Sequence, residues 1–101
     1  MCGIAGFVGL RPLDRQKRRH LAQVFSSVWA AHETRGRDAS GALVRRADGR
    51  IMVFKTPGVT SHIVKPVTSE VVEGDHVPLV VGHTRLATSG DPRYNVNNHP
   101  F

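Results

Sequence analysis

The clearest hydrophobic pattern along the chain lies between residues 14 and 33. Apolar side chains recur there at helical spacing: Leu21, Val24, Phe25, Val28 and Trp29. Asp14 is suited to capping the start of this helix, and Gly36 follows its end as a stop signal. The pattern therefore predicts an amphipathic helix whose apolar stripe packs on a sheet or on another helix.

Shorter apolar runs predict strands on both sides of this helix. Four of them are bounded by Gly, Pro or Asp-Gly, as is typical of strands: residues 4–8, 39–46, 50–56 and 77–81. Asp48-Gly49 predicts a hairpin turn between the middle two. Residues 59–72 are ambiguous because Pro66 argues against one long helix, and residues 82–101 read as an irregular polar loop. The order of elements predicts an α+β fold.

The composition allows a modest core and raises one alternative function. The chain has 101 residues, 40% of them hydrophobic, and a net charge of +6. A basic domain raises nucleic acid as a partner, but five cations fall in one short stretch: Arg11, Arg15, Lys17, Arg18 and Arg19. With one Trp and one Tyr, the chain offers few stacking platforms for bases. We interpret the basic stretch as the solvated start of the helix, which disfavours a nucleic-acid partner.

The cysteine content and the N-terminus point to a reducing cytoplasmic setting. No apolar run is long enough to cross a bilayer, and the first residues lack the features of a secretory signal. The single cysteine, Cys2, excludes an internal disulfide and a cysteine-rich zinc site. We therefore expect no membrane partner, no metal and no cofactor.

Cys2 is the first candidate for chemistry because of its position. A lone cysteine is most often an inert buried side chain. Cys2 is small enough for the initiator Met1 to be removed, which would give one residue both a thiol and a free α-amine. The reference pKa of that amine, about 7.7–8.0, lets it exchange a proton near neutral pH. Such a residue is a nucleophile with its own base and needs no separate catalytic histidine.

Three further segments place polar side chains beside glycine or proline. Residues 35–38 (Arg-Gly-Arg-Asp) follow the predicted helix, and alone they are most simply a charged turn. Residues 82–90 place Arg85 in a glycine-flanked loop. There it could form a bidentate pair with a carboxylate, or it could be an ordinary cation of a basic loop without a ligand. His99 could be a metal ligand, a base or a structural hydrogen-bond donor, and the structural role is the commonest.

Together, four ordered segments closely resemble the glutaminase domain of the class II glutamine amidotransferases. They are Met-Cys-Gly-Ile-Ala-Gly-Phe at residues 1–7, Arg-Gly-Arg-Asp-Ala-Ser-Gly at 35–41, Gly-His-Thr-Arg-Leu-Ala-Thr-Ser-Gly at 82–90 and Asn-Asn-His-Pro at 97–100. The resemblance spans essentially the whole chain and is weakest between residues 57 and 78. It implies that the α+β fold is the N-terminal part of the four-layer αββα sandwich of N-terminal-nucleophile (Ntn) hydrolases.

The resemblance also implies a role for each matching residue. Cys2 would be the nucleophile, and Arg35 would support the pocket around it. Arg85 would bind the α-carboxylate of glutamine, and Thr88 would lie in the same pocket. His99 matches the family's Asn-x-His-Pro segment and would be structural.

The sequence departs from the family's pattern in two ways. Leu86 stands where the aminosugar branch has Trp, and Ser89 stands where it has His, which argues against that branch. The family's Asn-Gly oxyanion pair and its acidic residue for the α-amine would both follow Phe101. We therefore expect residues 1–101 to be a partial glutamine amidotransferase type-2 domain with little glutaminase activity alone.

The main hypothesis is hydrolysis of L-glutamine to glutamate and ammonia through a γ-glutamyl thioester on Cys2. The ammonia would pass to an unidentified acceptor in a synthase domain or subunit. The alternative is a catalytically inactive truncated remnant that serves as a structural or interaction module. An unpaired sheet edge would also allow the chain to form oligomers.

Overall fold

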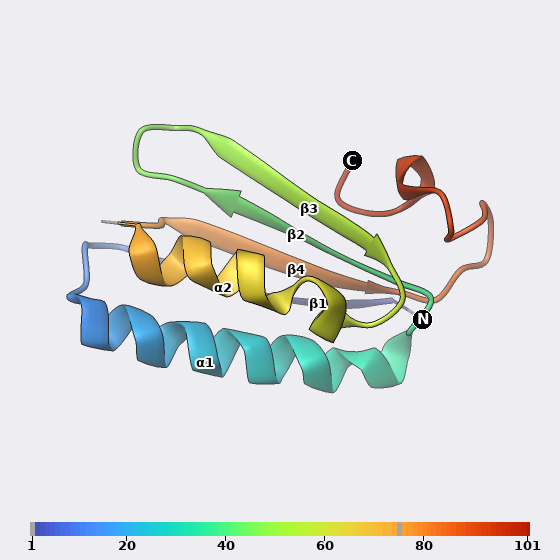
Figure 1. Ribbon diagram of the computed structural model, residues 1–101, viewed down its shortest axis with the longest axis horizontal. Helices are drawn as coiled ribbons and strands as arrows, with labels where there is room; N and C mark the ends of the chain where they lie inside the picture. The colour runs from blue at the N-terminus through green and yellow to red at the C-terminus, as the bar shows by residue number, and fades with distance from the viewer. Residues whose placement is uncertain (1, 75) are drawn as a thin grey trace.

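The computed structural model describes residues 2–74 and 76–101, so the predicted loss of Met1 lies outside the described residues. Within them, one antiparallel sheet is formed by β1 (Gly3–Val8), β2 (Ala39–Arg45), β3 (Ile51–Pro57) and β4 (Leu79–Arg85). The helices α1 (Arg15–Ala31) and α2 (Val64–Glu73) both cover one face of this sheet (Figure 1). Short 3-10 turns lie at His32–Arg35, Thr60–His62 and Asn95–Asn97. The predicted α+β class is confirmed.

The strand order brings distant parts of the sequence to one end of the sheet. The order is β1-β4-β2-β3, so the last strand of the chain lies between the first two. The register pairs Gly3 with Thr84 and Ala39 with Arg85. Because neighbouring strands are antiparallel, the starts of β1 and β2 therefore meet the end of β4.

Helix α1 begins where the sequence predicts, but its buried stripe is rotated. The Asp14 carboxylate accepts a hydrogen bond from the Lys17 amide at 2.9 Å, which confirms the predicted cap. The buried side chains are Ala22, Phe25 and Trp29. Val24 and Val28, predicted to belong to the stripe, are 46% and 44% exposed. The small Ala22 is buried with the two aromatic side chains, whereas the two valines are exposed to solvent.

The core between the helices and the sheet is built around two aromatic side chains. Trp29 stacks on Phe25 at 5.4 Å between ring centroids, and Phe7 of β1 meets Phe25 edge-on at 6.0 Å. The Trp29 indole nitrogen donates to the carbonyl of His83 at 3.3 Å. A Cβ at Gly82 would lie 2.8 Å from the indole, so glycine is what makes room for Trp29 on β4.

Two predictions about the second half of the chain are corrected. Residues 82–85 continue strand β4 and are not loop, because β1 and β2 flank β4 and satisfy the backbone of these polar residues. The ambiguous connector contains α2, in which Pro66 lies in the first turn. The backbone N–H groups of a helix's first turn have no acceptor within the helix, so proline, which lacks this N–H, costs no hydrogen bond there. The predicted hairpin is confirmed, with Gly49 at a φ of 90° in the turn.

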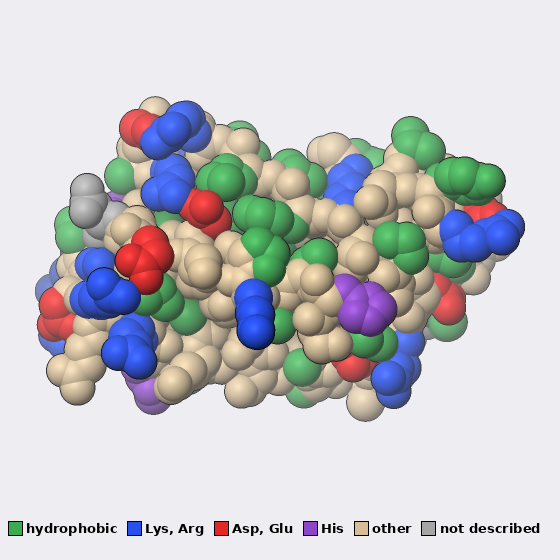
Figure 2. Space-filling model, viewed as in Figure 1, with side chains coloured by type: hydrophobic (Ala, Val, Ile, Leu, Met, Phe, Trp, Pro, Cys, Tyr) green, Lys and Arg blue, Asp and Glu red, His purple; other side chains and the backbone are tan. Residues whose placement is uncertain are grey.

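The basic stretch lies at the end of the molecule where α1 begins, and Lys and Arg side chains gather there (Figure 2). Arg15 pairs with Glu73 at 3.0 Å, and Lys17 lies 3.9 Å from Asp14. Arg18 is half-buried and donates to the carbonyls of Leu13 and Val72. The solvated interpretation therefore holds for most of the stretch, whereas Arg18 ties the two helices together.

The sheet face away from the helices is only partly covered. Alternation along β1 and β3 places four apolar side chains on it, exposed by 68%, 69%, 59% and 47%: Ile4, Val8, Ile51 and Val53. The C-terminal segment crosses another part of this face, where the His99 backbone leaves no room for a side chain at Gly41. Among the described residues, none of the helices has the length and apolar character needed to cross a membrane.

Candidate active site

Three of the sequence motifs converge at the end of the sheet where β1 begins and β4 ends. Continuing the β1–β4 register by one residue beyond Gly3 and Thr84 brings Cys2 beside Arg85. On its other side, Arg85 pairs with Ala39 of β2. The Arg-Gly-Arg-Asp motif of residues 35–38 directly precedes Ala39 and therefore reaches the same end of the sheet. Residues separated by about eighty positions in the sequence thus share one sheet end.

Cys2 presents a free, exposed thiol at this end. Its sulfur lies 3.9 Å from the carbonyl oxygen of Leu86, the residue directly after β4. Gly3 is enclosed, since a Cβ there would lie 2.7 Å from both the His32 Cβ and the Thr84 hydroxyl. Glycine after the cysteine therefore lets β1 run close to the end of α1 while Cys2 remains accessible.

The residues 35–38 motif is docked on the backbone of residues 85–87. A Cβ at Gly36 would lie 2.6 Å from the Arg85 carbonyl oxygen and still closer to the Leu86 nitrogen. The Asp38 amide donates to the Arg85 carbonyl at 2.9 Å, and the Asp38 carboxylate accepts from the Ala87 amide at 2.8 Å. Gly36 and Asp38 therefore hold the segment that faces the Cys2 thiol.

Arg35 lies on the rim of an open pocket beside this contact. Residues 33–38 and Leu86 line the pocket, and the Arg35 side chain is exposed. The guanidinium is thus near the Cys2 end of the molecule and accessible to solvent.

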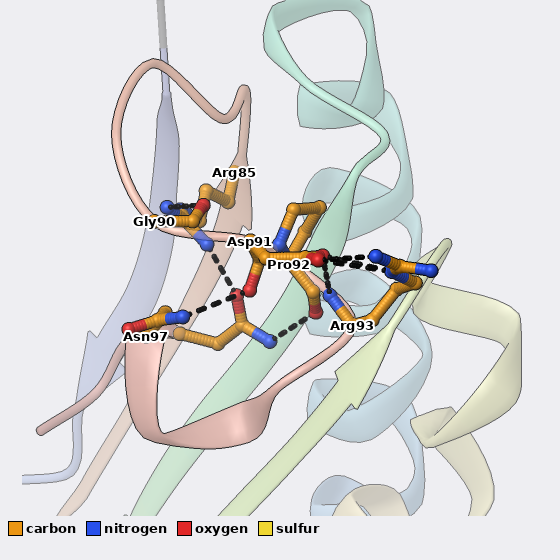
Figure 3. Close-up of polar contacts among 7 residues, drawn as sticks. Arg85, Gly90, Asp91, Pro92, Arg93 and Asn97 are labelled. Atoms are coloured by element: carbon orange, nitrogen blue, oxygen red, sulfur yellow. Dashed lines mark hydrogen bonds and ion pairs between the residues drawn. The ribbon is translucent and has the colours of Figure 1, made fainter.

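Arg85 is a buried cation that is held by neutral oxygens. The residue is 6% exposed. One terminal nitrogen donates to the Asn98 side-chain oxygen at 2.7 Å. The other donates to the carbonyl of Ser89 and, as Figure 3 shows, to that of Gly90. Within residues 2–74 and 76–101, no carboxylate lies at ion-pairing distance from this guanidinium. Buried charges are usually paired. Hydrogen bonds from Arg93 lower the pKa of the Asp91 carboxylate, and the charge of Arg85 lowers it further, but Asp91 forms its ion pair with Arg93.

Asn98 is the partner that sequence reasoning missed. It is completely buried, and its amide nitrogen donates to the carbonyl of Pro92 at 2.8 Å and to the Asn95 side chain at 3.1 Å. Only a run of loop asparagines before His99-Pro100 could have drawn attention to it, since asparagine often bonds to loop backbone.

Thr88 and His99 both lie on the segment that follows β4. Thr88 is exposed in the loop whose next two carbonyls bind Arg85. The His99 ring packs 4.6 Å from the ring of His83 and 4.2 Å from that of Phe101, on the sheet face away from the helices. No group of His, Cys, Asp and Glu side chains in the described part of the chain is suited to a metal ion.

His83, which precedes Arg85 on β4 by two residues, has an altered pKa. Burial lowers the pKa of His83 from its ordinary value, and the charges of His99 and Arg85 lower it further. Its Nδ1 is buried and has no hydrogen-bond partner among the described residues. The neutral form of the His83 ring is therefore favoured.

Comparison with known proteins identifies the family. No family model matches the chain. Curated relatives match it over 100 residues, which is 98–99% of the chain: they are 31% identical in Chlamydia trachomatis, 35% in Thermus thermophilus and 33% in Staphylococcus aureus. The chain belongs to the class II glutamine amidotransferases. Each of these relatives is named glutamine–fructose-6-phosphate aminotransferase (isomerizing).

The match covers a small part of each relative. The chain spans 14% of their length. Their name joins glutamine to amino transfer onto a sugar phosphate, which is the aminosugar branch. The expectation that Leu86 and Ser89 separate the chain from that branch is therefore not supported.

Among solved structures, similarity extends to the fold alone. One chain of a complex of the beta-clamp processivity factor and the little finger domain of PolIV matches with a TM-score of 0.53 and 12% identity. The match covers 90% of this chain and 94% of that chain. It shows that a helix-covered sheet of this kind occurs as a unit of similar size elsewhere.

Proposed function

We propose that the chain carries the glutamine-hydrolysing chemistry of its family, with Cys2 as the nucleophile. The Cys2 sulfur would bond to the side-chain carbonyl carbon of glutamine, and the carbon–nitrogen bond would break. The α-amine of Cys2, freed by loss of Met1, would carry the proton to the departing ammonia. Water would then resolve the γ-glutamyl thioester to glutamate and return the thiol.

The observation that carries this proposal is the pairing of an accessible thiol with a buried guanidinium that forms no ion pair with a carboxylate of the described residues. Cys2 and Arg85 lie side by side by register, at the ends of two neighbouring strands. A free amino acid has its carboxylate at one end and, in glutamine, its reactive amide at the other. Arg85 would hold the carboxylate by charge-assisted hydrogen bonds while the amide faces the sulfur.

The other candidate residues would complete this pocket. Thr88 has an exposed hydroxyl three residues after Arg85, close enough in sequence to reach the same ligand. Arg35 would support the thiol end from the rim of the open pocket. His99 would be structural, which is supported by its packing against His83 over Gly41.

The ammonia would serve an amino transfer in a larger assembly. The relatives named above are about seven times longer than the chain and bear the name of an aminotransferase acting on fructose 6-phosphate. We propose that a sugar phosphate, held by a synthase domain or a separate subunit, accepts the ammonia here as well.

The uncovered sheet face would pack against a second sheet. Ile4, Val8, Ile51 and Val53 leave apolar surface in water on the face opposite the helices. A sheet stacked there would bury them and convert one helix layer and one sheet layer into the αββα sandwich of the Ntn hydrolases.

The proposed function can be tested with the chloromethyl ketone analogue of L-glutamine, from which the Cys2 sulfur would displace chloride. We expect labelling at Cys2 only, followed by mass spectrometry, and saturable protection by L-glutamine but not by D-glutamine. Cys2→Ala provides the blank. Labelling that L-glutamine does not slow would show that no glutamine site adjoins Cys2, and the proposal would be wrong.

A further inference from the structure

The burial of Arg85 sets a requirement on the group that holds it. The guanidinium is removed from water, yet among the described residues its hydrogen-bond acceptors are neutral: a side-chain amide oxygen and two backbone carbonyls. Neutral acceptors fix the position of a cation without cancelling its charge. A carboxylate at the same place would fix the position of the guanidinium and would also neutralise its charge.

The Asn98 side chain can present only its oxygen to Arg85. Its amide nitrogen is committed to the carbonyl of Pro92 and to the Asn95 side-chain oxygen. Because Asn98 is completely buried, water cannot replace these partners. The amide is thus locked between the loop and the guanidinium.

We propose that Asn98 is a positioning residue that holds Arg85 with a neutral oxygen, so that the charge of the guanidinium remains available to the carboxylate of an amino acid. The inference rests on the proposed function. Asn98 occupies the unspecified position of the Asn-x-His-Pro motif, so the family resemblance assigns it no role. The Asn98 oxygen fixes the orientation of the Arg85 guanidinium. Because this oxygen carries no charge, the guanidinium keeps its affinity for an anion.

The test compares two reagents that differ only in charge. Cys2 is labelled with the chloromethyl ketone analogue of L-glutamine and with the same compound carrying a carboxamide in place of its α-carboxylate. The ratio of the two second-order rate constants measures the preference for the carboxylate. Iodoacetamide, which needs no pocket, reports the intrinsic reactivity of the thiol.

The informative substitution is Asn98→Asp, which keeps an oxygen facing Arg85 and adds the charge. We expect the carboxylate preference to fall about tenfold or more, the worth of one charge-assisted hydrogen bond. The iodoacetamide rate should stay within about twofold of the original, because Cys2 is untouched. Asn97→Asp is the matched control: it adds the same charge one residue away, and Asn97 bonds to the Asp91 carbonyl and not to Arg85.

Each outcome separates the inference from the proposed function. A folded Asn98→Asp that keeps the full preference, or that slows all three reagents equally, overturns the role of Asn98. If circular dichroism shows that Asn98→Asp does not fold, Asn98→Ala takes its place, and an unchanged preference there also overturns it. A wild-type chain without any preference for the carboxylate would remove the proposed role of Arg85, and the inference with it.

Discussion

The side chain of Arg85 donates to the amide oxygen of Asn98 across 2.7 Å. This bond joins the end of β4 to the segment before His99-Pro100, and both partners are buried. Two motifs that the sequence presents separately are therefore parts of one network. The network positions a cation at the end of the sheet where β1 begins, directly after Cys2.

Replacing Arg85 should weaken the binding of glutamine more than it slows the chemistry. Arg85→Ala removes the group proposed to hold the carboxylate in both the bound and the reacting state. We expect the L-glutamine concentration that half-protects Cys2 to rise about 10- to 100-fold. Arg85→Lys keeps the charge but lacks the forked guanidinium, so its half-protecting concentration should lie between those of wild type and Arg85→Ala. An unchanged protection constant with a collapsed labelling rate at saturation would place Arg85 at the reacting amide instead.

A methyl group at Gly36 should separate the two segments that meet beside Cys2. The Cβ of Gly36→Ala would press on the backbone of Arg85 and Leu86, which cannot turn aside as a side chain can. We expect a loss of about 1–3 kcal/mol in the free energy of unfolding, measured with urea. Gly49→Asn is a suitable control, because the hairpin turn is open and Asn tolerates a positive φ. Equal stability of the two variants would contradict the close contact at Gly36.

The stability of the fold should decrease as the pH falls below the ordinary pKa of histidine. The pKa of His83 in the folded chain is lowered from 6.5, so the unfolded chain binds a proton there first. Protonation therefore favours unfolding from about pH 6.5 down to the lower pKa of the folded state. Urea titrations at pH 7.5 and pH 5.5 should show a smaller difference for His83→Gln than for wild type. The control is His20→Gln, on the exposed side of α1, which should leave this difference in stability as it is in wild type. A difference for His83→Gln as large as that of wild type would contradict the effect.

The protein isolated from cells should begin at Cys2. The small cysteine side chain permits removal of Met1, and the proposed mechanism needs the free α-amine. Intact-mass spectrometry measures this directly. A preparation that turns over glutamine while it retains Met1 would exclude the α-amine as the proton carrier.

The uncovered sheet face should cause the isolated chain to associate. Ile51 and Val53 are exposed on β3, an edge strand of the sheet. Ile51→Thr with Val53→Thr should lower the weight-average mass in sedimentation equilibrium. Val24→Thr removes an equally exposed valine from α1 and should have no such effect. If it lowers the mass as much, association does not run through the sheet.

The parts of the fold that follow from local pattern could be predicted, and the rest depend on contacts across the sequence. The α1 helix, the β2–β3 hairpin and the start of β1 follow from periodicity, an N-cap and an Asp-Gly turn. The last four residues of β4 are polar or glycine, and they become strand only because two other strands flank them. Asn98 carries no charge and no reactive group, so only the buried guanidinium reveals its importance.

The placement of β4 between β1 and β2 has a consequence for the order of folding. During synthesis the first strand and the β2–β3 hairpin emerge without the strand that joins them, and their pairing must wait for residues 79–85. Closing the loop from β1 to β4 spans most of the chain, so the helices and the hairpin can form earlier than the sheet. Cys2 and Arg85 thus become neighbours in the same late step that completes the sheet. A nascent chain would have its thiol from the outset but would gain the amino-acid site proposed beside Arg85 only when that step is complete.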